Sequence, residues 1–369
     1  MNRRDMIKTM GSAAISLGMP GMAWAAPKPD SLYRNAIVID GNLAAPLEDD
    51  KPLDAAAAAE FRASGLTAFK QTLGGPGNRN KQQTDEEIAQ WQAAIGNNPD
   101  LLMTINSVAD FAVAKKSGRI GIILSFEAGE MLEGQIDNID HFHAAGILVM
   151  GLSYNRQTPF ASGTMVPQST GLTPLGREAV QRMNAQGVTI DVSHSDEQSS
   201  LGALEASNKP VLITHAGCAA VHPHPRNKSD ALLRAIADKG GVVGIYELSY
   251  LVSPPIRQPK LEDYLSHLTH ALKVCGEDHV GIGSDSQLTR FVTSPEMLKM
   301  WNDSIAARKA AGVAAPGEGP LPLVTGLNRS DRCAVIAGAL HKQGYGARTI
   351  EKVLGANFQR VFGETWTAG

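Results

Sequence analysis

The chain has 369 residues, of which 43% are hydrophobic, 19% are charged and 5% are aromatic, and its formal net charge is −3. This composition is too apolar for a disordered chain, and the length excludes a mini-protein held together by disulfides. The weakly acidic balance argues against a nucleic-acid-binding protein, for which a basic face is expected. Its 37 glycines and 20 prolines are scattered, which excludes a collagen-like repeat.

Residues 1–25 have the pattern of an export signal. Arg3 and Arg4 precede a short stretch of small and apolar residues, and Ala23-Trp24-Ala25 matches an A-x-A cleavage site. The paired arginines resemble a bacterial twin-arginine signal, and the alternative is an ordinary secretory signal. The stretch is too short and too rich in glycine and proline for a membrane anchor.

Removal of this segment takes the formal net charge from −3 to −5, because it carries three basic residues and one acidic residue. We expect residues 26–369 to form a single domain that is soluble and periplasmic. The three cysteines, Cys218, Cys275 and Cys333, lie far apart and form no C-x-x-C pair. A cysteine zinc site is therefore excluded, and we expect three buried thiols.

Eight short apolar runs recur along the chain, as expected for strands that are buried on both faces of a parallel sheet. They are 36–40, 66–70, 120–126, 147–152, 188–193, 210–214, 241–246 and 279–284. Helical patterns lie between them at 53–63, 85–95, 175–186, 199–206, 230–239 and 261–274. This alternation predicts an α/β fold, a closed (β/α)8 TIM barrel. The alternative is an open doubly wound sheet, but no G-x-G-x-x-G loop follows the first run.

The C-terminal part of the chain falls outside this alternation. Helical patterns at 332–342 and 349–362 predict C-terminal helices packed on the barrel. The segment 289–326, with Pro316, Pro320 and Pro322, is predicted to be irregular. We expect it to cover the barrel mouth or to form a dimer contact.

Polar residues stand at the carboxyl ends of the predicted strands, where barrels of this kind carry their chemistry. In chain order they are Asn42, Lys70, Glu127, Tyr154-Asn155, His194, His215, Glu247 and Asp285. Imidazole with carboxylate is the ligand chemistry of zinc and similar metals. Glu127, His194 and His215 would hold the metal, and Asp285 would act as general base.

A structural interpretation competes with this one. A single histidine after a strand is more often a hydrogen-bonded structural residue than a ligand, but two on adjacent strand ends with an acid on a third favour a site. Asp285 carries less weight alone, because aspartate is common in turns. His222 and His224 are expected on a loop, with a pocket role suggested by the nearby Arg226.

From about 36 to 362 the chain resembles the membrane (renal) dipeptidases, zinc hydrolases of the amidohydrolase superfamily. The resemblance rests on the order and spacing of several motifs. They are V38-I-D-G41, S125-F-E-A-G129, G171-L-T-P-L-G176, I190-D-V-S-H194, T214-H-A216, R226-N227, V280-G-I-G-S-D285 and N357-F-Q-R-V-F362.

The resemblance implies a role for several residues. Glu127 would bridge two zinc ions, and His194 and His215 would hold the second of them. Arg226 would bind the terminal carboxylate of a substrate, a task that suits its planar guanidinium. Asp285 would serve the catalytic water and the substrate amine. Members of the family cleave dipeptides and tend to form dimers, so a homodimer is expected.

The chain departs from the family at two places. The family's first strand ends in H-x-D, which supplies two ligands to the first zinc, whereas this chain has Asn42-Leu43-Ala44. Tyr154 replaces a histidine thought to steady the tetrahedral intermediate, and it can donate a hydrogen bond but carry no positive charge. We therefore expect one zinc ion rather than two, with Asn42, Tyr154 and Asn155 in the substrate site.

Lys70 raises a further hypothesis. Its ammonium would reach the vacant first position and replace the missing cation, and the alternative is a side chain that extends to solvent.

Three functions follow from these residues. The first is a zinc-dependent hydrolase of dipeptides or small dipeptide-like amides. The second is an altered amidase or lactamase, or an enzyme that matures a secreted peptide metabolite. The third is a degenerate barrel that binds a peptide or a partner. Asn42, Ala44 and Tyr154 favour the third, and the retained acids and histidines argue against it.

Overall fold

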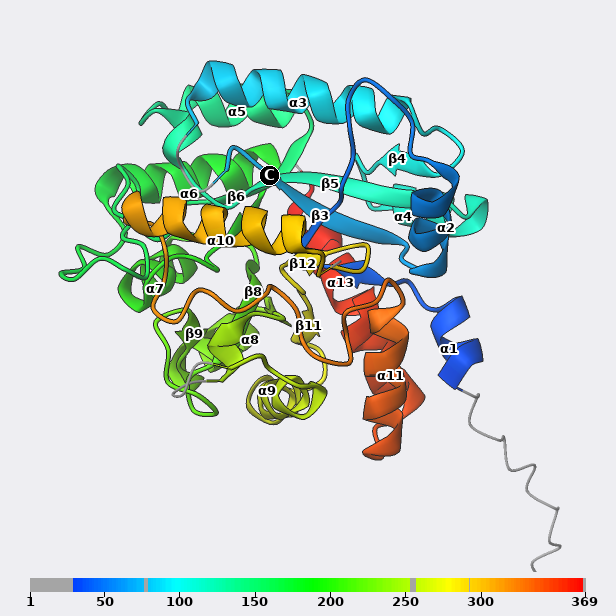
Figure 1. The fold of residues 1–369 in the computed structure, drawn as a ribbon. Helices are drawn as coiled ribbons and strands as arrows, with labels where there is room; N and C mark the ends of the chain where they lie inside the picture. The colour runs from blue at the N-terminus through cyan, green and yellow to red at the C-terminus, as the bar shows by residue number, and fades with distance from the viewer. Residues whose placement is uncertain (1–28, 76–78, 253–256, 292, 368–369) are drawn as a thin grey trace, which may run out of the picture.

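A computed structural model describes residues 29–75, 79–252, 257–291 and 293–367. The predicted export signal therefore lies outside the described residues. The molecule is a parallel β-barrel surrounded by helices (Figure 1). Its eight barrel strands are β1 (Ile39–Asp40), β3 (Ala68–Leu73), β5 (Ile120–Phe126), β6 (Ile147–Gly151), β7 (Thr189–Asp191), β8 (Val211–Cys218), β10 (Val242–Ile245) and β11 (Val280–Ile282).

The barrel closes through the pairing of β10 with β8, which an open sheet with the same strand order would lack. Strand β10 pairs with β8, where Val243 lies opposite Ile213, and also with β11. Strand β11 in turn pairs with β1, where Ile282 lies opposite Asp40. The ring is parallel throughout, and each of the eight apolar runs overlaps one of its strands. The predicted (β/α)8 barrel is confirmed.

Two strands are longer than predicted. Strand β3 continues from Lys70 to Leu73, because Gln71 and Thr72 keep their pairing with β5 although both are polar. Strand β8 continues to Cys218, so His215 lies within the strand rather than after it. Polar residues can occupy these positions because their side chains meet other polar groups in the interior near the barrel mouth. The sequence pattern therefore placed both strand ends too early.

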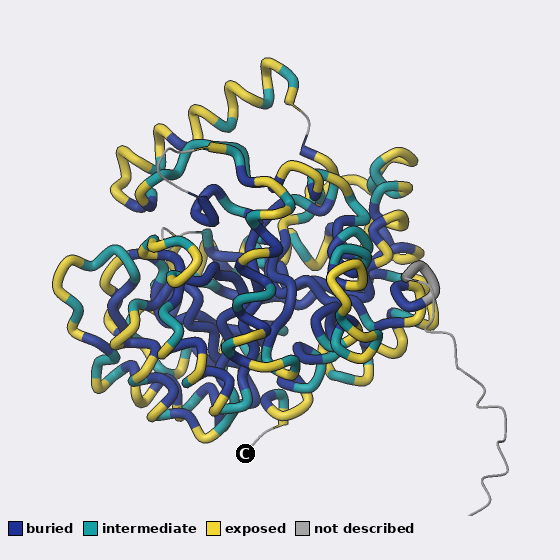
Figure 2. Tube along the Cα trace, turned by 90° about the horizontal axis from the view of Figure 1, so that it is seen from below, coloured by how far each residue is buried: buried dark blue, intermediate teal, exposed yellow. Residues whose placement is uncertain are grey.

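Short strands outside the barrel wall are β2 (Leu43–Ala44), which pairs with β12 (Ser286–Gln287), β4 (Leu102–Thr104), which pairs with β5, and β9 (Asn227–Lys228), which pairs with β8. The β2–β12 pair connects the loops that follow β1 and β11. Figure 2 shows that the buried chain gathers in the centre, inside an exposed outer layer. All three cysteines are buried free thiols, as predicted.

The helices agree with the predicted positions at most places. They are α1 (Pro29–Asn35), α2 (Ala55–Ala63), α3 (Lys81–Gly96), α4 (Ala109–Ser117), α5 (Asp137–Ala144), α6 (Pro174–Gln186), α7 (Glu197–Ala206), α8 (Asp230–Asp238), α9 (Leu261–Cys275) and α10 (Pro295–Ala310). The start of α6 follows from its sequence, because Thr173 accepts a hydrogen bond from the backbone of Gly176 and Pro174 occupies the first turn. Short 3-10 turns lie at Glu130–Leu132 and Ser249–Leu251.

The prediction that 289–326 is irregular is wrong, because it contains the 16-residue helix α10. Ser294 caps this helix and Pro295 stands in its first turn, which is a regular start signal. Ile305 is the one buried residue of the helix, so the apolar periodicity that marks a packed helix is missing. Helix α10 was missed because it lies on the surface of the barrel mouth.

The C-terminal helices are α11 (Arg332–Lys342), α12 (Ala347–Glu351) and α13 (Asn357–Thr365), with a π turn, η3, at Lys352–Ala356. Phe358 of α13 lies directly against Gly41 and Gly281, where an added Cβ would come within 2.5 Å of its ring. The predicted packing of this tail on the barrel is confirmed. No helix among the described residues combines the length and the apolar character that a membrane crossing requires.

Candidate metal centre and substrate pocket

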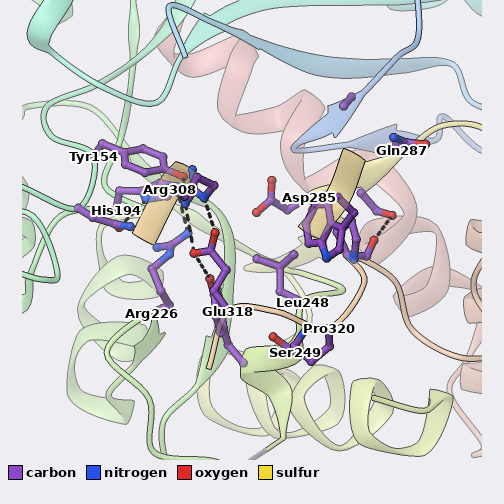
Figure 3. Close-up of a pocket in the computed structure, with 16 residues that line it drawn as sticks. Tyr154, His194, Arg226, Leu248, Ser249, Asp285, Gln287, Arg308, Glu318 and Pro320 are labelled. Carbon is purple, nitrogen blue, oxygen red and sulfur yellow. Dashed lines mark hydrogen bonds and ion pairs between the residues drawn. The ribbon is translucent and has the colours of Figure 1, made fainter. Parts of the chain in front are cut away.

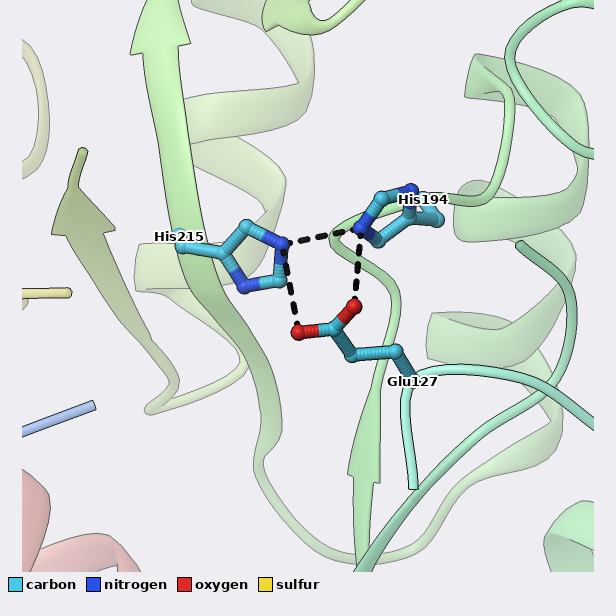
Figure 4. Close-up of side chains that lie close together, drawn as sticks. All are labelled: Glu127, His194 and His215. Carbon is cyan, nitrogen blue, oxygen red and sulfur yellow. Dashed lines mark hydrogen bonds and ion pairs between the residues drawn. The ribbon is translucent and has the colours of Figure 1, made fainter. Parts of the chain in front are cut away.

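Three side chains, from the ends of β5 and β7 and from β8, converge at one point (Figure 4). Glu127 follows β5, His194 lies in the loop after β7, and His215 lies in β8. The Nε2 atoms of the two histidines are 2.9 Å apart. The Glu127 carboxylate lies 3.4 Å from His194 Nε2 and 3.9 Å from His215 Nε2. The three residues predicted as metal ligands thus come together.

The outer nitrogens of both histidines have partners that fix the tautomers. His194 Nδ1 lies 3.0 Å from Asn155 Oδ1, which can only accept, so Nδ1 carries the proton. Thr214 donates its hydroxyl proton to Asp191 at 2.5 Å, so it accepts from His215 Nδ1 at 2.9 Å. Each Nε2 therefore presents a lone pair to the centre. Such second-layer partners orient metal-binding histidines.

The electrostatics of this centre favour a bound cation. Burial, followed by the charge of Arg226, lowers the pKa of His194 to about 3, and burial also holds the pKa of His215 well below its usual value. Burial opposes ionisation of Glu127, but its charged surroundings, Lys70 among them, outweigh it and keep the pKa of Glu127 well below its usual range. Arg226 donates to one of the two lone pairs, that of His194 Nε2, at 3.1 Å. The lone pair of His215 and the Glu127 carboxylate still face each other and repel unless a cation lies between them. The donor set fits zinc.

The other side of Glu127 is filled by hydrogen-bond donors. Asn42 Nδ2 donates to Glu127 Oε1 at 2.6 Å and to Asp285 Oδ1 at 2.9 Å. The Thr72 hydroxyl lies 2.9 Å from Glu127 Oε1, and Lys70 Nζ donates to Thr72 at 3.1 Å. Lys70 is fully buried, so the alternative of a lysine that extends to solvent is excluded. It contacts Glu127 through Thr72 rather than directly.

Asp285 stands beside this group in an unusual conformation. Its φ of 51° is in the left-handed region, which non-glycine residues rarely adopt. Burial and the nearby charge of Glu127 raise the pKa of Asp285 to about 7. A carboxyl group with that pKa can both accept and donate a proton near neutrality. This property suits the predicted general base.

Arg226 is buried and spans from the loop of His194 to the pocket. It donates through Nη1 to Ser193 O and through Nη2 to His194 Nε2 at 3.1 Å. Lys228 holds the same loop, because its Nζ donates to Ser195 O at 2.7 Å. Two buried cations thus fix the backbone that carries His194. His222 and His224 lie on the adjacent loop, and His224 stacks on Tyr250 with ring centroids 4.3 Å apart.

Tyr154 forms one wall of the pocket. Its ring stacks on His194 with centroids 3.9 Å apart, and its hydroxyl accepts from Arg308 of α10 at 3.2 Å. Arg308 also pairs with Glu318. Figure 3 shows these residues gathered with Arg226 on one side of the pocket and Asp285 across from them. Asn155 is bound from the same covering segment, because its Nδ2 donates to Val313 O at 2.8 Å.

The pocket has a volume of about 300 Å³ and opens between these walls. The segment 289–326 contributes Trp301, Arg308 and Glu318 to its lining, which agrees with the expectation that this segment covers the barrel mouth. Several pocket residues were not predicted from the sequence, among them Tyr250, Trp301, Arg308 and Glu318. Three of these four lie in the segment that was predicted to be irregular, and only the Ser294-Pro295 start signal could have pointed to them.

Glu247, which stands after the seventh barrel strand, lies outside this pocket. Its buried carboxylate is 3.7 Å from Arg332 of α11, and neither oxygen has a hydrogen-bond partner among the described residues. Burial, partly offset by the charge of Arg332, raises the pKa of Glu247 to about 7. It connects the barrel to the C-terminal helices instead of contributing to the centre.

A (β/α)8 barrel with two histidines and a glutamate at its mouth defines the class of amidohydrolase-like metallohydrolases. Comparison with known proteins agrees with this class. The sequence profile of the membrane dipeptidases (peptidase family M19) matches residues 31–307. The structure is similar to an amidohydrolase from Pseudomonas aeruginosa, with a TM-score of 0.78, 28% identity, and coverage of 92% of this chain and 99% of that one.

Two curated sequences are also similar. An uncharacterized protein in the pqqA 5' region of Klebsiella pneumoniae is 27% identical over 290 residues, which cover 76% of this chain and 95% of that protein. Dipeptidase tcpJ of Claviceps purpurea is 24% identical over 251 residues, which cover 68% of this chain and 52% of that protein. The chain belongs to the membrane dipeptidase family, a family of metallo-dipeptidases, as the sequence resemblance implied.

Proposed function

We propose that this protein is a periplasmic hydrolase that uses one zinc ion to cleave dipeptides or small dipeptide-like amides. The observation that carries the proposal is the convergence of His215, the Glu127 carboxylate and His194, with the atoms 2.9 to 3.9 Å apart, where His194 also lines the pocket. Three ligands with an open side are typical of catalytic rather than structural zinc.

Zinc held by Glu127, His194 and His215 would supply Lewis acidity toward a carbonyl oxygen and a water molecule. Asp285 lines the pocket, and its carboxylate would take the proton of the attacking water and pass it to the leaving amine. Asn42 donates to one oxygen of Asp285 and holds the carboxylate in place. The Tyr154 hydroxyl is available to donate a hydrogen bond from the opposite wall.

Arg226 is the candidate for binding the substrate carboxylate. In the described structure its Nη2 donates to His194 Nε2. That lone pair cannot serve both an N–H donor and a metal ligand bond, so Nη2 is free for a carboxylate in the loaded site. Arg308, on the same side of the pocket, adds positive charge that Glu318 partly neutralises. A cavity of about 300 Å³ suits a small substrate.

The proposed location rests on Arg3, Arg4 and the Ala23-Trp24-Ala25 site, and the proposed homodimer rests on the family resemblance. A second candidate, hydrolysis of a different small amide or a lactam, is favoured by Tyr154 and Asn42. They replace residues that the dipeptidase resemblance implies, and they change the donors offered to the substrate.

The test is hydrolysis by zinc-loaded mature protein of a panel that contains L,L and L,D dipeptides, N-acyl amides and lactams. We expect release of the C-terminal residue from dipeptides, lost in His194→Ala and kept in His341→Ala, which changes an exposed histidine on α11. Activity on amides or lactams alone would favour the second candidate. A loaded protein inert toward the whole panel would contradict both.

A further inference from the structure

Lys70 is a buried cation that the proposed mechanism does not use. Its side chain is fully buried in the barrel interior. Its Nζ donates to Thr72 at 3.1 Å and to Ser125 at 3.2 Å. An ammonium group in such a place is costly unless nearby negative charge compensates for it. The question is which carboxylate it serves.

Asp191 is the nearest carboxylate, with its Oδ2 3.9 Å from Lys70 Nζ, but it is already well satisfied. It accepts from the backbone and hydroxyl of Ser193 and from the backbone and hydroxyl of Thr214. Lys70 makes no hydrogen bond to it, because 3.9 Å is too long. Asp191 alone therefore does not explain why the Lys70 ammonium group points toward Thr72 and Ser125.

The hydrogen bonds of Lys70 lead to Glu127 instead. Lys70 donates to Thr72, whose own proton can reach Glu127 Oε1 at 2.9 Å. Asn42 Nδ2 occupies the rest of that side, between Glu127 Oε1 and Asp285 Oδ1. Two donors, Asn42 and Thr72, thus occupy the side of Glu127 where a second cation would lie, and Lys70 stands behind Thr72. The positive charge of Lys70 polarises the Thr72 hydroxyl, which strengthens the hydrogen bond that Thr72 donates to Glu127.

We propose that Lys70, acting through Thr72 and beside Asn42, is the fixed cation of the centre and limits it to one metal ion held by Glu127, His194 and His215. The inference rests on the metal site of the proposed function and adds a role for residues outside the ligand set. Lys70 is a positioning and charge-compensating residue, since it touches neither substrate nor ligand.

The test compares Lys70→Met with Lys70→Arg, which keeps the charge, in zinc titrations and in thermal unfolding with and without chelator. Wild type and Lys70→Arg should each bind one zinc per chain. Lys70→Met should bind zinc about tenfold or more tightly, because a like charge near the dication is gone. Its Tm in chelator should fall by about 5–10 °C, and zinc should restore most of that loss.

A control separates Glu127 from Asp191 as the group that Lys70 serves. In Lys70→Met/Asp191→Asn the charge of Asp191 is removed together with that of Lys70. If Lys70 serves Glu127, the double variant still binds zinc more tightly than Asp191→Asn alone. Equal zinc affinity in these two proteins would overturn the proposal, as would equal zinc response in Lys70→Met and wild type.

Should Lys70→Met fail to fold, Thr72→Val breaks the connection while Lys70 remains. It should also show a Tm loss in chelator that zinc repairs, and a metal response identical to wild type would contradict the proposal. None of these readouts uses a substrate. If the variants respond to zinc as expected but the protein cleaves no dipeptide, only the proposed function is contradicted. If the protein is active but the variants respond to zinc like wild type, only this inference is contradicted.

Discussion

The two sides of Glu127 are built in opposite ways. On the side of β7 and β8, His194 and His215 present nitrogen lone pairs beside the Glu127 carboxylate, and Arg226 donates to one of them, His194 Nε2. On the side of β1 and β3, Asn42 and Thr72 present protons, and a buried lysine stands behind them. One carboxylate therefore separates a half that needs a metal from a half that is already neutralised by the chain.

This difference is the basis of the proposal that the centre holds one metal ion on an unchanged family fold. The barrel fixes where each side chain points, and the residue type at each position decides whether the space holds an ion or a hydrogen bond. An amide at Asn42 offers two protons where a carboxylate or imidazole would offer a lone pair. The predictions below test the two sides separately.

The largest effect is expected from His215→Ala. This change removes one of three ligands and leaves Thr214 without its imidazole partner, so zinc should be lost and activity should fall by about 10³-fold or more. Metal content and the rate of dipeptide cleavage measure the effect. If the variant still binds one zinc ion per chain, the metal site lies elsewhere. His341→Ala is the surface control.

Asp285→Asn should lower the rate of hydrolysis by about 10²- to 10³-fold, because an amide cannot accept the proton of the attacking water. Zinc content should not change, since Asp285 is not among the three ligands. Steady-state kinetics together with metal analysis check this. A parallel loss of zinc would show that Asp285 belongs to the metal-binding half.

Asp285→Asn should also change how stability depends on pH in the metal-free protein. The pKa of Asp285 is raised to about 7 in the fold, so its contribution to stability is fully present below pH 4 and is lost as the pH rises to 7. In chelator, the variant should gain on the order of 3 kcal/mol relative to wild type between pH 4 and pH 8. Denaturant unfolding at both pH values measures the gain, and an unchanged difference would contradict the shift.

The smallest effect is expected from Tyr154→Phe. The ring can keep its stacking on His194, while the hydrogen bond from Arg308 is lost. Loss of one partly buried hydrogen bond is worth about 1 kcal/mol, so substrate binding should weaken by roughly fivefold with zinc content unchanged. Steady-state kinetics measure this as a higher KM. A turnover rate that drops by about a hundredfold or more would instead give the hydroxyl a direct role at the reacting carbonyl.

The sequence was sufficient for the barrel and for the metal-binding half. Buried parallel strands leave continuous apolar runs, and Glu127, His194 and His215 stand next to such runs, so their meeting follows from the topology. The side of Glu127 that carries Asn42, Thr72 and Lys70 could be predicted only in part. Lys70 appeared to end a strand, because the polar Gln71 and Thr72 interrupt the apolar pattern although the pairing continues to Leu73.

The pocket walls could not be predicted, for a different reason. Arg308 and Glu318 lie in a covering segment whose helix buries a single residue, so no periodic signal marks it. Their contacts with Tyr154 and Tyr250 join residues about 70 to 150 positions apart in the sequence. Such pairings depend on how a surface segment folds over the mouth, which local patterns do not encode.

The most direct test of the contrast across Glu127 is the number of metal ions bound by wild type and by Asn42→Asp, measured on the intact protein by native mass spectrometry and elemental analysis. The substitution exchanges the bridging amide for an oxygen of similar size between Glu127 and Asp285. We predict one ion in wild type and a second, weaker one in the variant. Two ions in wild type, or one in both proteins, would contradict the account.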